Sequence, residues 1–143
     1  MCDDSYMAWT VLVVDDHPAF RASARRLLEL DGFRVVGEAA DAESALRLTR
    51  TLRPAIALLD IGLPDRSGFE VAEELAGGTR VVLISSRGHA DLGKRVRESG
   101  ALGFISKEDL SGEAISPATR KDQATATMAA ARVGVVSGPR LST

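Results

Sequence analysis

The stretch VLVVDDHPAF, residues 11–20, sets two adjacent aspartates directly after an unbroken run of apolar, mostly β-branched residues. Such a run indicates a buried strand, and Pro18 suits the first turn of a helix that begins just beyond the aspartates. Carboxylates this close together repel one another. The stretch therefore predicts a strand, a polar turn and a helix, and it raises the question of what compensates the charges of Asp15 and Asp16.

The length and charge of the chain limit its class. Its 143 residues suit one domain, and a chain of this size buries about 68–70% of its unfolded surface in one core. The 20 acidic and 18 basic residues nearly cancel, which excludes a chain-wide positive field that would attract nucleic acid or an anionic membrane. We therefore expect no direct binding to nucleic acid or to a membrane.

The N-terminal residues and the cysteine usage favour a cytoplasmic protein. The start, MCDDSYMAWT, carries acids where a signal peptide needs basic residues. No apolar run approaches the roughly 18 residues of a membrane span. The single cysteine, Cys2, excludes an internal disulfide framework and suits a reducing compartment.

Five short apolar runs predict strands. Most of them are near-continuous in Val, Ile and Leu rather than alternating with polar residues, which is typical of parallel strands covered on both faces. The runs are TVLVV at 10–14, FRVVGEA at 33–39, AIALL at 55–59, RVVLI at 80–84 and GFIS at 103–106.

The segments between these runs predict helices. Apolar residues recur at helical spacing in the first two segments, and two shorter helices are expected near 68–76 and 90–99. Strand, helix and strand repeated in this way predict an α/β fold: a doubly wound parallel sheet with right-handed crossovers and helices on both faces. The apolar face of the first predicted helix consists of Phe20, Ala24, Leu27 and Leu28, and that of the second consists of Ala42, Ala45, Leu46 and Thr49.

The residues at the predicted helix ends agree with this interpretation. Asp41 suits the N-cap of the second helix, and Gly32 and Gly100 suit left-handed positions just past helix ends.

Polar residues stand at the carboxyl ends of the predicted strands, where a doubly wound sheet binds its ligands. Three clustered carboxylates require a cation to stay ionised, and hard oxygen ligands favour Mg²⁺. The residues are Asp15 and Asp16 after the first strand, Asp60 after the third, Ser85 and Ser86 after the fourth, and Ser106 and Lys107 after the fifth.

This set of groups suits phosphoryl transfer. A carboxylate beside Mg²⁺, with a hydroxyl and an ammonium nearby, can receive a phosphoryl group and form an aspartyl phosphate. Asp60 is the expected acceptor because it faces the aspartate pair from the neighbouring strand. Each residue alone also suits an ordinary role, as a helix-dipole partner, a turn residue or a surface charge. Their combination at four strand ends favours the phosphoryl site.

Four motifs carry a resemblance to a known family: VLVVDDHP, LLDIGLPDRSGFE, VVLISS and GALGFISK. Over residues 9–112 the chain resembles the receiver (CheY-like) domain of two-component response regulators, in the style of the DDHP receivers that are attached to DNA-binding effectors. The resemblance implies a flavodoxin-like, five-stranded sheet of order 2-1-3-4-5. It also implies a phosphoacceptor switch rather than an enzyme, with a sensor histidine kinase or a phosphotransfer protein as partner.

The resemblance also implies a role for each site residue. For the metal, Asp16 would bind Mg²⁺ directly, Asp15 would bind it largely through water, and Gly62 would bind it through its carbonyl. Asp60 would be both the phosphoacceptor and a ligand of the metal. Ser85 would be the switch hydroxyl, Lys107 the phosphate-binding lysine and Phe104 the rotameric aromatic. Glu108 stands where many receivers have a cis-proline.

Two other functions share part of this pattern. A haloacid-dehalogenase-like phosphohydrolase also uses a strand-end aspartate with Mg²⁺, but it needs a second aspartate two residues later, where this chain has Gly62. A nucleotide-binding module needs a G-x-G-x-x-G or G-x-x-x-x-G-K-[ST] motif, and the sequence contains neither.

The resemblance ends after residue 112. We expect an N-terminal extension at 1–8, the receiver at 9–112 and a low-complexity tail at 113–143, with an atypical or incomplete fifth helix and no DNA-binding effector. The tail is either a natural extension or the product of a frameshift or cloning junction near Ile115. A tail that does not pack would leave strand side chains uncovered, which predicts marginal stability or a homodimer formed through the face beside the first helix.

Overall fold

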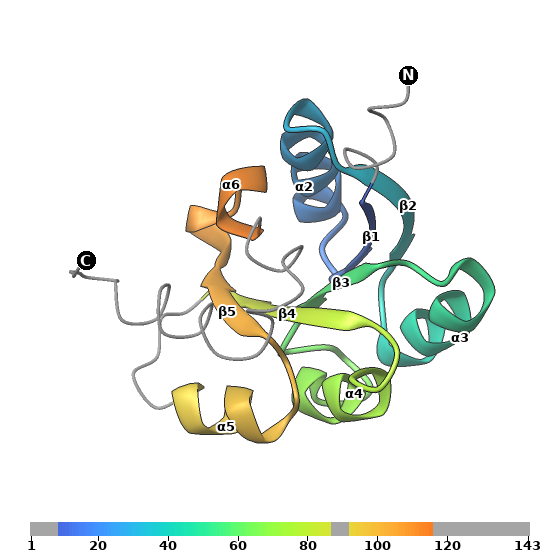
Figure 1. Cartoon of the computed structure of the whole chain (residues 1–143), viewed down its shortest axis with the longest axis vertical. Helices are drawn as coiled ribbons and strands as arrows, with labels where there is room; N and C mark the ends of the chain where they lie inside the picture. Colours follow the sequence, from blue (N-terminus) through green and yellow to red (C-terminus); the bar gives the residue numbers. More distant parts are fainter. Residues whose placement is uncertain (1–8, 87–91, 116–143) are drawn as a thin grey trace.

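The computed structural model describes residues 9–86 and 92–115, which form one parallel sheet with helices on both faces (Figure 1). The strand order is β2-β1-β3-β4-β5, so the predicted fold class and the predicted order are both confirmed. The strands are β1 (Thr10–Val14), β2 (Arg34–Ala39), β3 (Ile56–Asp60), β4 (Arg80–Ser85) and β5 (Gly103–Ser106).

The helices divide between the two faces of the sheet. Helices α2 (Pro18–Leu30) and α6 (Gly112–Ile115) cover one face, whereas α3 (Ala42–Leu52), α4 (Gly68–Leu75) and α5 (Leu92–Glu98) cover the other (Figure 1). A short 3₁₀ helix, η1 (Lys107–Asp109), follows β5. Every predicted strand and helix in this part of the chain is present, with ends that differ from the prediction by at most two residues. The predicted start of the helix near residue 90 lies outside the described residues.

Each central strand supplies side chains to two separate cores. In β3, Ile56 and Leu58 pack toward α2, whereas Ala57 and Leu59 pack toward α3 and α4. All four side chains are fully buried. The lack of polar alternation in the sequence therefore follows from the sheet being covered on both sides.

The predicted helix ends are confirmed. Pro18 occupies the first turn of α2, and the Asp41 side chain accepts a hydrogen bond of 2.8 Å from the Ser44 backbone N–H at the start of α3. Gly32 (φ 96°) and Gly100 (φ 85°) have the left-handed backbone that glycine adopts without strain.

One residue of the predicted α2 face is not in the core. Ala24 and Leu28 are fully buried and Phe20 is half-buried, but Leu27 is 39% exposed. The buried row of this helix follows the i, i+4 spacing of residues 20, 24 and 28, so Leu27 lies on its flank. On α3 the predicted face is confirmed: Ala42, Ala45 and Thr49 are buried and Leu46 is half-buried.

The core beneath α2 extends to the last described residues. Ala114 and Ile115 of α6 are buried in it, and so are the β1 and β3 side chains on this face. The strand side chains on this face are therefore not exposed, in contrast to the condition from which self-association was predicted. Self-association stays a prediction. The predicted extension at 1–8 and the tail from 116 to 143 lie outside the described residues, so the division into domains stays a prediction. Among residues 9–86 and 92–115, no helix is long and apolar enough to cross a membrane.

Candidate functional site

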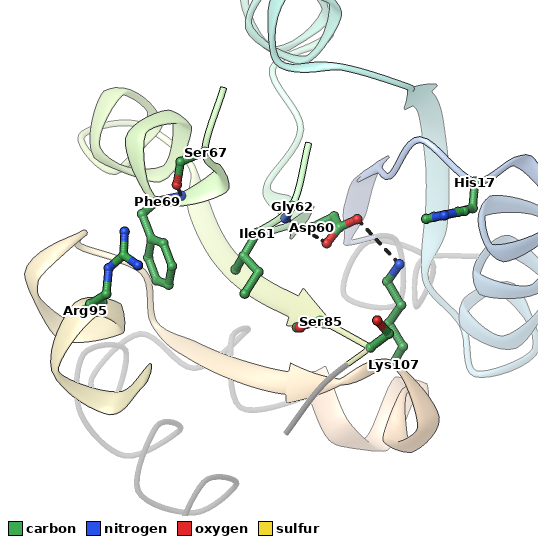
Figure 2. Close-up of a pocket in the computed structure, with 10 residues that line it drawn as sticks. His17, Asp60, Ile61, Gly62, Ser67, Phe69, Ser85, Arg95 and Lys107 are labelled. Atoms are coloured by element: carbon green, nitrogen blue, oxygen red, sulfur yellow. Dashed lines mark hydrogen bonds and ion pairs between the residues drawn. The ribbon is translucent and has the colours of Figure 1, made fainter. Parts of the chain in front are cut away.

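The carboxyl ends of β1, β3, β4 and β5 bring the predicted residues to one edge of the sheet. Asp15, Asp60 and Ser85 are all buried there, with exposed fractions of 0%, 6% and 5%. Lys107 follows β5 directly and extends toward Asp60 (Figure 2). The topological rule for parallel sheets therefore located this cluster correctly from the sequence.

Lys107 lies between two buried carboxylates. Its Nζ is 2.5 Å from Asp15 Oδ2 and 3.5 Å from Asp60 Oδ2. The same Nζ lies 4.7 Å from the centre of the Phe20 ring of α2, within the range of a cation–π contact. The ammonium group thus offsets part of the charge of the buried acids.

The charge of Asp60 is only partly compensated. Burial raises the pKa of its carboxyl above the usual value, and the nearby Asp15 adds to that increase. The hydrogen bond from the Gly62 backbone N–H to Asp60 Oδ1 (3.0 Å) and the charge of Lys107 oppose the shift but do not cancel it. A further positive charge at this position would stabilise the ionised form.

Four side chains form a cluster that can hold a metal ion: Asp15, Asp16, His17 and Asp60 each offer a ligand atom within 4.8 Å of the others. The aspartates were predicted and His17 was not. The Nδ1 of His17 lies 2.8 Å from Asp15 Oδ1 and 3.1 Å from Asp16 Oδ1. Its place directly after the acid pair was the available signal, but the sequence does not show which way the imidazole turns.

The cluster fits a hard divalent cation. Asp15 Oδ2 is buried, and the Lys107 ammonium is the positive charge beside it. Carboxylate oxygens are the ligands that Mg²⁺ takes in proteins. The donor set of the cluster therefore agrees with the predicted kind of metal.

The backbone of the loop between β3 and α4 packs closely against the end of β3, where Asp60 lies. Gly62 and Ser67 form an antiparallel bridge across it, and the Gly68 N–H donates to the Ile61 carbonyl at 3.0 Å. A side chain at Gly68 would place its Cβ 2.3 Å from the Asp60 carbonyl oxygen. Glycine at this position therefore permits the backbone of α4 to approach that of β3.

A cleft of about 390 Å³ opens beside Asp60 (Figure 2). Lys107 and His17 line one end, and Phe69 and Arg95 line the other, where the Arg95 guanidinium lies 4.2 Å from the ring centre of Phe69. These contacts between α4 and α5 were not predicted, because they depend on how two helices pack rather than on any motif. The remaining lining residues are Asp60, Ile61, Gly62, Ser67, Ser85 and Ser86.

Phe104 lies within the core rather than in the cleft. It is 6% exposed, pairs with Leu83 across the β4–β5 ladder and packs on the side of α3, α4 and α5. Ser85 pairs with Ser106 two residues further along the same ladder. The two predicted switch residues thus lie near one another in the register of β4 and β5.

The fold and the site together define a class of protein. A five-stranded parallel sheet of order 2-1-3-4-5, with acidic residues after β1 and β3 and a lysine after β5, is the arrangement of a phosphoacceptor domain of the flavodoxin-like type. The family model described as the response regulator receiver domain matches residues 11–116. The chain belongs to this family.

Relatives and solved structures agree with this assignment. A Pseudomonas aeruginosa protein described as a transcriptional regulator is 42% identical over 102 residues, which cover 69% of this chain and 49% of the relative. BvgA of Bordetella pertussis, described as a transcription regulator of virulence factors, is 35% identical over 111 residues, covering 76% of this chain and 53% of BvgA. The chain thus spans about half the length of these curated relatives.

Two solved structures show the same fold. The signal receiver domain of the response regulator NarL from Mycobacterium tuberculosis is 35% identical, with a TM-score of 0.72, and the match covers 78% of this chain and 96% of that one. CheY of Borrelia burgdorferi, solved in complex with CheX, BeF₃ and Mg²⁺, is 28% identical, with a TM-score of 0.70, and the match covers 80% of this chain and 88% of that one. These comparisons give no support to the haloacid-dehalogenase alternative.

Proposed function

We propose that this receiver domain accepts a phosphoryl group on Asp60 and changes conformation as a result, with a histidine kinase or a phosphotransfer protein as the donor. The observation that carries the proposal is the position of Asp60: it is buried at the end of β3, faces Lys107 and borders the cleft. In the transfer, an oxygen of Asp60 bonds to phosphorus while the bond from phosphorus to the donor's histidine nitrogen breaks. The electron pair of that bond stays on the nitrogen, and the imidazole leaves as neutral histidine, with its proton on the other ring nitrogen or taken up from water by the leaving one.

Mg²⁺ is the expected cofactor of this reaction. The residues that would hold it are the carboxylates of Asp15, Asp16 and Asp60 and the carbonyl of Gly62. When bound, the ion would offset the negative charge that gathers on the phosphoryl oxygens. Lys107 would contribute a second positive charge, because its ammonium lies near Asp60.

Ser85 and Phe104 are the proposed switch residues. The hydroxyl of Ser85 would contact the phosphoryl group, and Phe104 would move in response. A shift from 1:99 to 99:1 between two states needs about 5.5 kcal/mol of differential binding. One hydrogen bond to a charged group supplies about 1.5–3 kcal/mol. Contacts of Lys107 and of the metal must therefore supply the remainder.

The chain would act as a switch rather than as an enzyme, in the cytoplasm. Its output is not assigned, because the chain spans about half of the regulators it matches. The absence of direct binding to nucleic acid or to a membrane, and the possible homodimer, stay predictions from the sequence.

The test is phosphorylation of the full chain with acetyl phosphate and Mg²⁺, read by intact mass. The wild type should gain one phosphoryl group, and Asp60→Asn should gain none. Glu73→Gln is the matched control, because it removes an exposed carboxylate of α4 that does not line the cleft. Full phosphorylation of Asp60→Asn, or of the wild type in excess EDTA, would refute the proposal.

A further inference from the structure

Asp65 joins the loop between β3 and α4 to a different helix. Its Oδ1 accepts a hydrogen bond of 2.8 Å from the Ala42 backbone N–H, and its Oδ2 accepts one of 3.1 Å from the Glu43 backbone N–H. Ala42 and Glu43 are the first two residues of α3. The carboxylate thus crosses from the loop that carries Gly62 to the N-terminus of a neighbouring helix.

The start of α3 is capped by two aspartates with separate tasks. Asp41, the local N-cap, takes the N–H of Ser44, whereas Asp65 takes those of Ala42 and Glu43. The first N–H groups of a helix have no partner within the helix, and their positive end attracts a carboxylate. In agreement, the pKa of the Asp65 carboxyl lies below its usual value, chiefly because of the hydrogen bond from Ala42.

The same loop is joined to the phosphoacceptor. The Gly62 N–H donates to Asp60 Oδ1, and the Gly62–Ser67 bridge closes the loop around residues 63–66. Asp65 lies inside this closed segment. Because the bridge ties the two sides of the loop together, a displacement of Asp65 would be transmitted to Gly62 and so to the hydrogen bond with Asp60.

We propose that Asp65 is a positioning residue that uses the N-terminus of α3 to fix Gly62 relative to Asp60, and thereby sets the Mg²⁺ affinity of the site. The metal part of this inference rests on the proposed function. The Asp65 carboxylate accepts its hydrogen bonds from α3 and not from Asp60 or Gly62, so its effect would pass through the loop. None of the roles implied by the family resemblance involves this residue.

The decisive comparison is between Asp65→Ala and Asp41→Ala in the full chain. Both variants remove a carboxylate cap from the start of α3, but only Asp65 belongs to the loop that carries Gly62. Titration calorimetry with Mg²⁺ should show about a tenfold weaker affinity for Asp65→Ala, in line with residues that support metal ligands. Asp41→Ala should bind Mg²⁺ like the wild type.

A second measurement tests the positioning without any metal. In the metal-free protein, the amide hydrogen of Gly62 should exchange faster in Asp65→Ala than in Asp41→Ala, because its hydrogen bond to Asp60 is less constrained. If Asp65→Ala does not fold, Asp65→Asn replaces it. Asparagine keeps one acceptor oxygen for one of the two amides, so an intermediate effect on both measurements is expected.

The outcomes separate the inference from the proposed function. Wild-type protein that binds no Mg²⁺ would overturn the metal site, while the exchange of Gly62 would still test the positioning role. A folded Asp65→Ala with wild-type exchange at Gly62 would overturn the inference. Equal losses in both alanine variants would also overturn it, because they would show that the effect comes from the stability of α3.

Discussion

Lys107 and Asp15 form an ion pair at the edge of the sheet, with Nζ 2.5 Å from Oδ2, and the Asp15 side chain is fully buried. Asp15 is also one of the carboxylates proposed to hold the metal. The lysine therefore provides positive charge beside a carboxylate with which the cation is expected to interact. The removal of Lys107 should therefore destabilise the fold, and bound Mg²⁺ should offset part of that loss.

The first prediction concerns Lys107→Ala. Breaking a buried ion pair by removal of one partner costs about 3–5 kcal/mol, because it leaves an uncompensated charge. We expect a loss of this order in the free energy of unfolding without metal, and a large part of it should be recovered at saturating Mg²⁺. Urea unfolding with and without Mg²⁺ measures both values. The same loss under both conditions would contradict the compensation described here.

Gly68 allows a test of the backbone approach beneath Asp60. In Gly68→Ala, the added Cβ would lie 2.3 Å from the Asp60 carbonyl oxygen and 2.6 Å from Ile61 Cα, so the backbone must shift. Overpacking of this kind costs about 1–3 kcal/mol, and phosphorylation should slow because Asp60 moves with its backbone. Gly77→Ala is the matched control, since no described atom beyond its chain neighbours lies within 4 Å of its added Cβ. Equal stability and equal labelling of the two variants would argue against the close approach.

Acid stability should depend on Glu38 of β2. Hydrogen bonds from Arg25 and Arg21 lower the pKa of its carboxyl below the ordinary value of 4.5. A group with a lowered pKa contributes stability above its unfolded-state pKa and loses it as the pH falls through the folded-state value. Glu38→Gln should therefore have a lower free energy of unfolding than the wild type at neutral pH. Below pH 4.5 the two free energies should become more similar, because the wild type loses the contribution of ionised Glu38. Urea midpoints across this range test the prediction, and a constant difference would refute it.

The switch can be followed at Phe104. A fluorine label on this ring should change its NMR signal when beryllofluoride and Mg²⁺ are added to the wild type. Ser85→Ala should reduce the change, because the hydroxyl at the end of β4 is lost. Thr51→Ala is the control and should keep the wild-type response, because it removes an exposed hydroxyl of α3 that does not line the cleft. An unchanged wild-type spectrum would rule out this route from the site to the core.

The elements and the core of the site followed from the sequence for a physical reason. Continuous apolar runs identify strands that are covered on both faces, and parallel strands necessarily gather their carboxyl ends at one edge. Asp15, Asp60, Ser85 and Lys107 all follow such runs directly. Their proximity was therefore a consequence of topology and needed no knowledge of side-chain conformation.

The contacts that the sequence did not reveal depend on loops and on helix packing. Asp65 reaches α3 only because of the path of the loop, and Arg95 meets Phe69 only because α4 and α5 lie side by side. The exposure of Leu27 likewise depends on which side of α2 meets the sheet. Hydrophobic spacing indicates that a helix has a buried face, but it does not fix the edges of that face.

The side chains of β3 alternate between two cores, so the site depends on the number of residues in this strand as well as on their type. Ile56 and Leu58 pack in one core, and Ala57 and Leu59 pack in the other. One residue inserted early in β3 would therefore place every following side chain of the strand on the opposite face of the sheet. Large residues would then meet space shaped for alanine, and the carboxylate of Asp60 would turn away from Lys107. An exchange of one apolar residue of β3 for another would leave this alternation intact, whereas a change in the number of residues between the start of β3 and Asp60 would not.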